Sequence, residues 1–232
     1  MARTVVIGAN RGIGLELVRQ LSARGEQVIA TSRSAAPPEL KDRVTMVEGV
    51  DITKASTLSP LVEACKGGVS TLIVNAGLLV AASDGKKLTE LGEADLKAFS
   101  DEWEVNAMGP LRTVVALQGC LSEGAKVTLL GTTLSSTAKN EGGLYGYRAS
   151  KCALHNIGAG LAQDLKGKAS VGIVHPGFVE TGMTDPLGFK AGTGGVVDTR
   201  ASAAAILKVV DGLTPENSGS AWDALTGETF PW

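Results

Sequence analysis

The chain has 232 residues, of which 44% are hydrophobic and 20% are charged, and this length suits one domain, residues 1–232, with a substantial core. Its formal net charge of -2 argues against nucleic acid or an anionic membrane surface as the main partner. No apolar run approaches the ~20 residues that a membrane-spanning helix needs.

The first predicted unit is a strand, a glycine-rich turn and a helix. Residues 3–7 (RTVVI) are β-branched and apolar, and they lead into the turn 8–14 (GANRGIG) and a helix that stops near Gly25. In such a unit the first glycine permits a tight turn, the second admits phosphate to backbone N–H groups, and the third lets the helix pack closely. The turn therefore predicts a pyrophosphate site at Gly8, Asn10, Arg11, Gly12, Ile13 and Gly14. The alternative is a turn without a ligand.

The second predicted strand, residues 27–32, selects between the two nicotinamide dinucleotides. A free ribose 2′-OH usually meets an Asp or Glu at the end of this strand, and Thr31, Ser32 and Arg33 stand there instead. Guanidinium groups of Arg33 and Arg11 suit a 2′-phosphate, so the pattern favours NADP(H) over NAD(H). Two solvated arginines on a loop are the alternative.

The next strands complete a doubly wound pattern. Residues 44–50 predict a third strand that ends at Asp51 and Ile52, expected at the adenine, although Asp51 could instead cap the next turn. A short helix (57–65) and a buried strand (69–74) follow, and then Asn75, Ala76 and Gly77, whose small size lets the backbone pass beside a cofactor. The strand–helix alternation predicts an α/β fold with a parallel sheet and right-handed crossovers.

A helical region begins at Leu88, after a polar segment at 81–87. Asp95, Lys97 and Glu102 are expected on its exposed side. An apolar stripe is expected at Trp103, Val105, Met108, Leu111, Val114 and Leu117. Asn106 interrupts this stripe as a functional or a structural residue, and Gly109 and Pro110 predict a local break that frees a backbone carbonyl.

The second half of the chain places hydroxyls, a tyrosine and a lysine after the fifth strand (126–130). Ligands bind at the carboxyl ends of parallel strands, where Thr132, Thr133, Ser135 and Ser136 follow. Tyr147 and Lys151 lie one turn apart on a helix that extends to about residue 166, and a nearby ammonium favours an ionised phenol. Alone, such a pair is usually an ordinary surface feature.

The remaining elements are a sixth strand (169–174), a glycine-rich lid (182–199), a helix (201–210) and a short strand at Trp222. His175 is expected to be structural, and His155 has no obvious partner. Two scattered histidines without Gly-x-Ser-x-Gly argue against a hydrolase triad.

Together these motifs resemble the short-chain dehydrogenase/reductase (SDR) family. They are Gly8-x-x-x-Gly12-x-Gly14, Asn75-Ala76-Gly77, Asn106, Tyr147-x-x-x-Lys151 and Pro176-Gly177-x-Val179-x-Thr181. The wording Tyr147-Arg148-Ala149-Ser150-Lys151, the pair Gly142-Gly143 and the terminal Pro231-Trp232 resemble its C-factor and Sniffer-like carbonyl reductase branch. The resemblance implies a seven-stranded parallel sheet and NADP(H)-dependent interconversion of alcohols and carbonyls.

The resemblance also implies residue roles. Tyr147 would protonate the substrate oxygen, Lys151 would lower its pKa and hold the nicotinamide ribose, and Asn106 would support a water relay. Pro176, Gly177, Val179 and Thr181 would face the nicotinamide, Val179 and Thr181 at its carboxamide. The family usually has a serine at the end of strand five. Alignment from the strand puts Thr132 there, with Gly131 where a second serine is common, whereas counting back from Tyr147 leaves Thr133, Ser135 and Ser136 open.

Substrate, partners and compartment are less constrained by sequence. Phe178, Met183, Leu187 and Phe189 favour a small apolar carbonyl compound, in a pocket expected between segments 81–90, 133–145 and 182–199. Apolar helix faces around 103–117 and 154–161 predict a homodimer or homotetramer. Three scattered cysteines and a strand at the N-terminus predict reduced thiols in a cytoplasmic protein. A cofactor-binding sensor or partner protein, and less so a dehydratase or epimerase, are the alternatives.

Overall fold

The computed structural model describes residues 3–35, 37–40, 44–80, 86 and 88–231. The strands are β1 (Arg3–Ile7), β2 (Gln27–Thr31), β3 (Thr45–Val47), β4 (Val69–Val74), β5 (Leu121–Leu130), β6 (Ala169–His175) and β7 (Ala221–Asp223). The helices are α1 (Gly12–Ala23), α2 (Ser59–Cys65), α3 (Glu93–Trp103), α4 (Gly109–Leu117), α5 (Tyr145–Asp164) and α6 (Thr199–Asp211). The polar segment 81–87, apart from Lys86, and the terminal Trp232 lie outside the described residues.

The strands form one seven-stranded sheet in the order β3-β2-β1-β4-β5-β6-β7, and each neighbouring pair is parallel. The predicted doubly wound α/β fold is therefore confirmed. The strand order reverses between β1 and β4, because the chain crosses over there to build the second half of the sheet. Such a switch point leaves a crevice at the carboxyl ends of the two strands, which is where ligands bind in open sheets of this kind.

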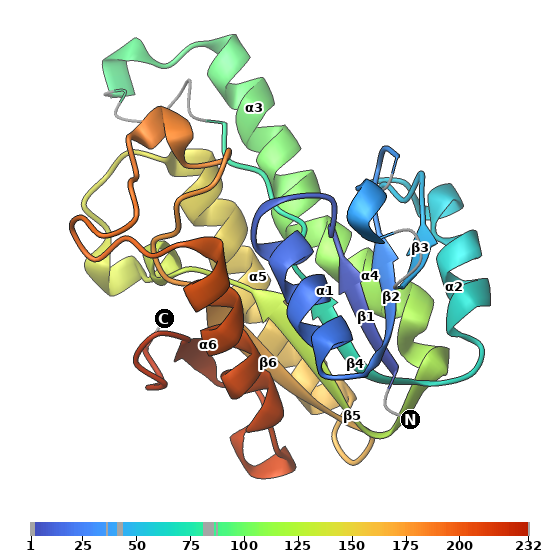
Figure 1. Ribbon diagram of the computed structural model, residues 1–232. Helices are drawn as coiled ribbons and strands as arrows, with labels where there is room; N and C mark the ends of the chain where they lie inside the picture. Colours follow the sequence, from blue (N-terminus) through green and yellow to red (C-terminus); the bar gives the residue numbers. More distant parts are fainter. Residues whose placement is uncertain (1–2, 36, 41–43, 81–85, 87, 232) are drawn as a thin grey trace.

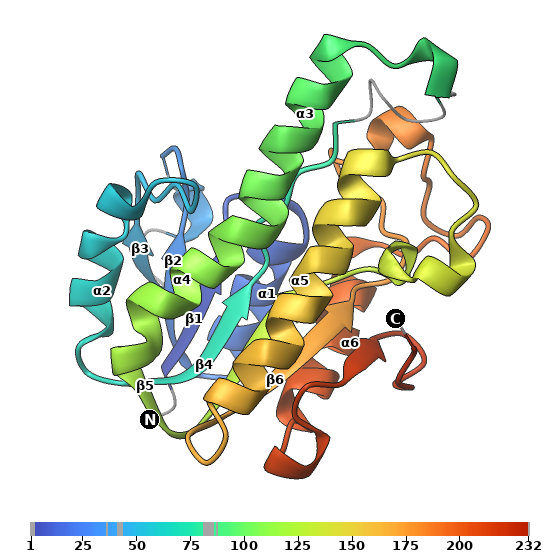
Figure 2. The ribbon, with the colours of Figure 1, turned by 180° about the vertical axis from the view of Figure 1, so that it is seen from behind.

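Helices cover both faces of the sheet. Figure 1 shows α1 and α6 on one face, and the reverse view in Figure 2 shows α4 and α5 on the other. Each face has its own buried apolar cluster, with Leu17 and Ile206 in the first and Val114 and Leu154 in the second. The strands between them are apolar on both sides, as a sheet buried on both faces requires.

The long helical region differs from its prediction. A π-helical turn at Glu104–Met108 separates α3 from α4, which confirms the expected break and shifts the register of the apolar stripe. Trp103 is consequently 45% exposed rather than buried. Glu102 and Asp95, expected on the surface, are 1% and 7% exposed, so this expectation was wrong. Asp95 turns back to accept the N–H of Gly92 at the start of α3.

The two helix faces expected to join copies of the chain differ in exposure. On α5, Leu154 and Leu161 are only 1% and 9% exposed and pack in the core, so the expectation for residues 154–161 was wrong. On α3 and α4, Leu96, Trp103 and Val115 are exposed, and a contact between copies there stays a prediction. None of the described helices has the length and apolar character that a membrane crossing requires.

Candidate active site

A cleft of about 630 Å³ opens at the carboxyl ends of β1 and β4, at the switch point of the sheet. Most of the residues predicted to bind the cofactor line it: Gly8, Asn10, Arg11, Gly12, Ile13, Arg33, Asp51, Ile52, Asn75, Ala76, Gly77, Tyr147, Lys151, Pro176 and Thr181. Tertiary structure thus brings together side chains from turns that are far apart in the sequence.

The glycine turn is shaped as the sequence predicted. Gly8 and Gly12 have positive φ angles of 81° and 56°, which favour glycine. A Cβ on Gly14 would lie 2.1 Å from the carbonyl oxygen of Gly8, so only glycine lets α1 approach the strand this closely. Asn75 donates its side-chain amide to the same oxygen at 2.7 Å and ties β4 to the turn, as expected. Gly14 itself packs behind the cleft and is absent from the residues that line it.

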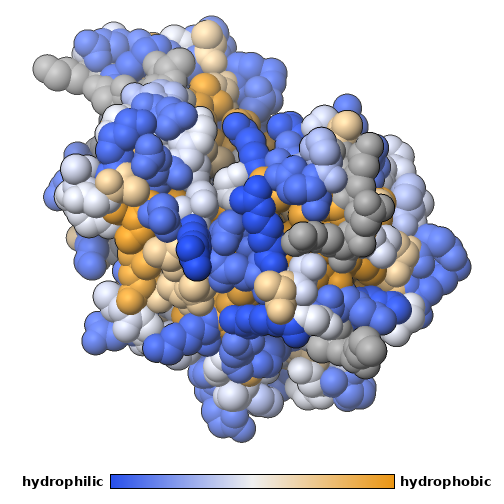
Figure 3. Space-filling model, in the orientation of Figure 1, coloured by the Kyte–Doolittle hydropathy of each residue, from blue (hydrophilic) through white to orange (hydrophobic). Residues whose placement is uncertain are grey.

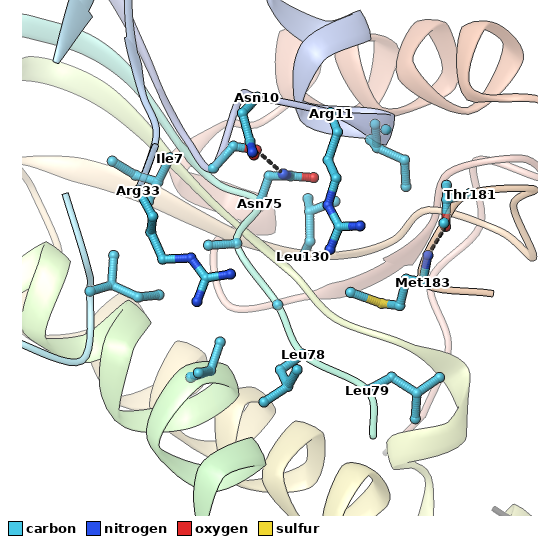
Figure 4. A pocket seen from close by; sticks show the side chains of 18 of the residues that line it. Ile7, Asn10, Arg11, Arg33, Asn75, Leu78, Leu79, Leu130, Thr181 and Met183 are labelled. Carbon is cyan, nitrogen blue, oxygen red and sulfur yellow. Dashed lines mark hydrogen bonds between the residues drawn. The ribbon is translucent and has the colours of Figure 1, made fainter. Parts of the chain in front are cut away.

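Two arginines stand at the end of the cleft beside the glycine turn. Arg11 and Arg33 reach into it from the turns that follow β1 and β2, and Leu78 and Leu79 lie across from them (Figure 4). Both arginines are exposed, and hydrophilic side chains spread across the middle of this face (Figure 3). Asp51 lines the same cleft and also accepts the N–H and hydroxyl of Thr53, so it caps its turn. These positions suit recognition of a phosphate by guanidinium groups.

Asn106 links the π-helical turn to the chain that leaves β4. Its Oδ1 accepts the N–H of Leu78 at 2.7 Å, and its Nδ2 donates to the carbonyl of Leu78 at 2.7 Å and to Ser150 Oγ at 3.1 Å. A Cβ on Gly77 would lie 3.4 Å from Asn106 Oδ1 and 3.6 Å from Lys151 Nζ. The small residue at 77 therefore keeps the floor of the cleft open beside both polar groups. A role for Asn106 in a water relay stays a prediction.

Tyr147 and Lys151 lie side by side on α5, but their electrostatics differ from the expectation. Burial raises the pKa of Tyr147 to about 12, the charge of Glu102 adds to this increase, and the side chain of Thr132 opposes it. Lys151 Nζ donates to the carbonyl of Leu130 at 2.8 Å and lies 5.9 Å from the centre of the tyrosine ring. Burial lowers the pKa of this ammonium to about 8. The net pKa of Tyr147 is therefore raised rather than lowered, because desolvation is the largest of these effects, and a lowering by Lys151 stays a prediction.

The four candidate hydroxyls after β5 have different surroundings. Thr132 is near enough to Tyr147 to act on its pKa, and its Oγ1 also accepts the N–H of Leu134 at 3.3 Å. Ser135 Oγ donates to the carbonyl of Thr132 and contacts His155 Nε2 at 3.1 Å. Ser136 Oγ is buried and makes no hydrogen bond within the described residues. The geometry thus favours Thr132 over Ser135 and Ser136 as the neighbour of the phenol, and Thr133 stays open.

His155, for which the sequence offered no partner, lies behind this turn. It is fully buried, contacts Ser135, and stacks on Phe230 with 5.7 Å between ring centres. A Cβ on Gly131 would lie 2.5 Å from its Nε2, so the imidazole occupies the space that a side chain at 131 would need. The histidine therefore supports the turn that carries Thr132.

The segment after β6 forms the remaining wall. Pro176, Thr181 and Met183 line the cleft, and the N–H of Met183 donates to Thr181 Oγ1 at 3.3 Å (Figure 4). Gly177 and Val179 do not line it; Val179 is buried and pairs with Val197. Of the four apolar residues expected at the substrate, Met183 is the one that lines the cleft. Phe178 and Phe189 instead stack edge to face on each other at 5.7 Å.

The sequence interpretation missed part of the site. The wall of Leu78, Leu79 and Val80 was not singled out, and Glu102 was expected in solvent. Glu102 Oε1 accepts the N–H of Val80 at 2.8 Å. Helical spacing gave no signal for Glu102, because the π-helical turn at Glu104–Met108 intervenes between it and Asn106. Asn106 and Glu102 thus fix the backbone of this wall by hydrogen bonds, Asn106 at Leu78 and Glu102 at Val80.

Comparisons with known proteins agree with this geometry. Residues 2–191 match the model of a family described as short chain dehydrogenase. The chain is 34% identical to the 1-hydroxy-2-glutathionyl-2-methyl-3-butene dehydrogenase of Rhodococcus over 94% of its length and 95% of that protein. It is 34% identical to C-signal of Myxococcus xanthus over 72% of its length and 95% of that protein. The crystal structure of NADPH-bound carbonyl reductase from chicken fatty liver superposes with a TM-score of 0.85, at 25% identity, over 100% of this chain and 99% of that one.

Proposed function

The chain belongs to the short-chain dehydrogenase family and is an oxidoreductase, and on this premise we propose that it reduces a small carbonyl compound with NADP(H), using Tyr147 as general acid. The observation that carries the proposal is the half-buried Tyr147 at the cleft, with Lys151 one turn away and Thr132 beside it. A phenol with a raised pKa is protonated at neutral pH, so it can donate a proton to a carbonyl oxygen.

The residues present fit a nicotinamide dinucleotide. Gly8 and Gly12 shape the turn at the start of α1, where backbone N–H groups favour a pyrophosphate. At the other end Lys151 and Thr181 line the cleft, and they would hold the nicotinamide ribose and carboxamide. When bound, the nicotinamide supplies the hydride that reduces the carbonyl carbon.

The protein's own groups supply orientation and the proton. Thr132 donates a hydrogen bond to the substrate oxygen, and Tyr147 donates the proton to that oxygen as negative charge develops there. Lys151 carries a positive charge close to the phenol and stabilises it once the proton has left. The apolar wall of Leu79, Val80 and Met183 keeps water from the reacting carbonyl and favours an apolar substrate.

The choice of NADP(H) over NAD(H) depends on Arg11 and Arg33. No acidic side chain follows β2, where one would bind a ribose 2′-OH, and both guanidinium groups reach into the cleft (Figure 4). The relative from chicken, at 25% identity, was solved with NADPH, which supports the same choice.

The catalytic role of Tyr147 is tested by NADPH oxidation with a panel of aldehydes, ketones and quinones. Tyr147→Phe removes the proton donor, and we expect activity to fall by about 10²-fold or more. Tyr145→Phe is the matched control, because Tyr145 is 41% exposed and packs on Phe99 away from the cleft. Binding of NADPH without turnover of any carbonyl or alcohol would favour a cofactor-binding sensor instead.

The cofactor assignment has a separate test. Arg33→Ala should weaken NADPH binding about tenfold or more and leave NADH binding nearly unchanged, since only NADPH carries the 2′-phosphate. Arg19→Ala, an exposed arginine of α1 that pairs with Glu39, is the control. Binding is followed by nicotinamide fluorescence, so no substrate is needed. Equal affinities for NADPH and NADH in the wild-type protein would contradict the role of Arg33.

A second candidate is the reverse reaction, oxidation of an alcohol. It is favoured by the relative from Rhodococcus, whose name describes dehydrogenation of a glutathionyl-substituted alcohol and which aligns with 94% of this chain. The same residues serve both directions, with Tyr147 accepting a proton rather than donating one. Rates measured with NADPH plus carbonyl and with NADP plus alcohol, at one pH, distinguish the two.

A further inference from the structure

Glu102 is a buried carboxylate that uses one of its two oxygens for a hydrogen bond within the described residues. The residue is 1% exposed, and its Oε1 accepts the N–H of Val80 at 2.8 Å. Its Oε2 is buried and has no hydrogen-bond partner within the described residues. An amide would serve Val80 equally well, and burial of an unpaired carboxylate oxygen is unfavourable. The charge therefore calls for an explanation other than the hydrogen bond to Val80.

The unpaired oxygen faces the start of the helix that carries Tyr147. A Cβ on Gly146 would lie 2.4 Å from Glu102 Oε2, so the carboxylate rests directly against the residue before Tyr147. The first turn of α5 contains no acidic residue, and its N-cap, Leu144, offers no side-chain hydrogen bond. A negative charge is favourable at such a helix start, and Glu102 supplies it from α3.

Two cationic side chains of α5 also lie near Tyr147. Lys151 lies one turn further along α5, and its ammonium donates to the carbonyl of Leu130 at 2.8 Å. Arg148 Nη1 donates to the carbonyl of Leu134 at 3.2 Å. On the remaining side stands the uncharged hydroxyl of Thr132, which interacts with the phenol. Tyr147 thus lies between a carboxylate and an ammonium, with burial strengthening the effect of both.

We infer that Glu102 is a positioning residue for the proposed reaction: its buried charge against the start of α5 opposes ionisation of Tyr147, and its hydrogen bond fixes Val80 in the cleft wall. The inference rests on the proposed function for the role of Tyr147. The protonated phenol is the form that donates to a carbonyl oxygen, whereas oxidation of an alcohol needs the phenolate. Glu102 therefore extends to higher pH the range in which Tyr147 can act as the acid of the reduction.

The first test measures the phenol directly and needs neither cofactor nor substrate. The chain has 2 tyrosines, Tyr145 and Tyr147, so in a Tyr145→Phe background the tyrosinate absorbance reports Tyr147 alone. Glu102→Gln in that background should lower the titration midpoint by roughly one pH unit, because a nearby negative charge is lost. Glu104→Gln is the matched control, since Glu104 is 49% exposed and pairs with Arg112. Circular dichroism at each pH confines the comparison to folded protein.

Two outcomes of the titration decide the inference. A lower midpoint in Glu102→Gln but not in Glu104→Gln supports it, and equal midpoints in folded protein overturn it. Glu102→Met, which removes the charge with similar volume, is the second variant should the glutamine variant not fold. If the titration midpoint falls equally in Glu102→Met and Glu102→Gln, the effect is due to the lost charge.

Activity provides the separate readout. In Glu102→Gln, the alkaline pH at which carbonyl reduction declines should move down by roughly one pH unit, in step with the titration midpoint, since reduction needs the protonated phenol. An unchanged pH profile of reduction, despite a shifted midpoint, would overturn the link between Glu102 and the reaction. If the midpoint shifts but the wild-type protein turns over neither carbonyl nor alcohol, the proposed function fails while the action of Glu102 on Tyr147 stands.

Discussion

Acid should destabilise this protein through its two histidines before most of its carboxylates are protonated. The chain contains 2 histidines. Burial lowers the pKa of each, His155 and His175, from 6.5 to about 4. For His155 the positive charge of Lys151 adds to the effect of burial. For His175 the charge of Asp223 partly opposes it. Both imidazoles are therefore neutral in the folded protein at a pH where the unfolded chain binds protons.

The sign and size follow from this difference. A group with a lowered pKa in the fold contributes stability that is fully present above pH 6.5 and is lost as pH falls toward about 4. A gap of about 2.5 in pKa corresponds to about 3 kcal/mol per histidine, at ~1.36 kcal/mol for each pKa unit. For each histidine, about 2 kcal/mol of this contribution to the free energy of unfolding is lost between about pH 6.5 and about pH 5.

Urea unfolding at about pH 7 and about pH 5 measures this loss in the free energy of unfolding. The double variant His155→Gln/His175→Gln should make the two values nearly equal, and each single variant should remove about half of the difference. Carboxylates such as Asp51 and Glu180, whose pKa values are lowered, titrate below this window. A wild-type free energy that does not change between the two pH values would refute the reasoning, because it would mean that both imidazoles take up protons without unfolding.

Further predictions concern the site. Thr132→Val should lower kcat by about 10²-fold and Thr132→Ser should preserve most of it; similar loss in both variants would assign the residue a packing role. Gly14→Ala places a Cβ 2.1 Å from the Gly8 oxygen, so the melting temperature and NADPH affinity should both fall, and an unchanged affinity would argue against a dinucleotide at this turn. Glu102→Gln should raise the free energy of unfolding by about 1 kcal/mol at neutral pH. Burial raises the pKa of Glu102, so the carboxyl destabilises the fold once pH rises above that pKa and it ionises. The stability gained by Glu102→Gln should therefore vanish in acid, where the carboxyl is protonated. A variant that is less stable than wild type at neutral pH would contradict this prediction.

Local sequence determined the elements and the order of the motifs. β1 and β4 match their expected bounds, because short β-branched apolar runs with a glycine at one end are typical of buried strands. The glycine turn and the 147–151 pair were equally clear, since their spacing carries a local physical meaning. These features sufficed to indicate the family that the comparisons later showed.

Side-chain environments required the tertiary structure. Helical periodicity placed Glu102 in solvent, but the π-helical turn and the chain leaving β4 enclose it. Counting along the chain left four hydroxyls open, and the folding of one turn onto His155 directs Ser135 away while Thr132 stays near Tyr147.

The sequence by itself determined that a tyrosine and a lysine share a helix face beside a nucleotide-type glycine turn. Only the tertiary structure decided which charge acts on that tyrosine. The pKa of a buried phenol depends on desolvation and on charges from other elements, and no spacing within one helix encodes either of them.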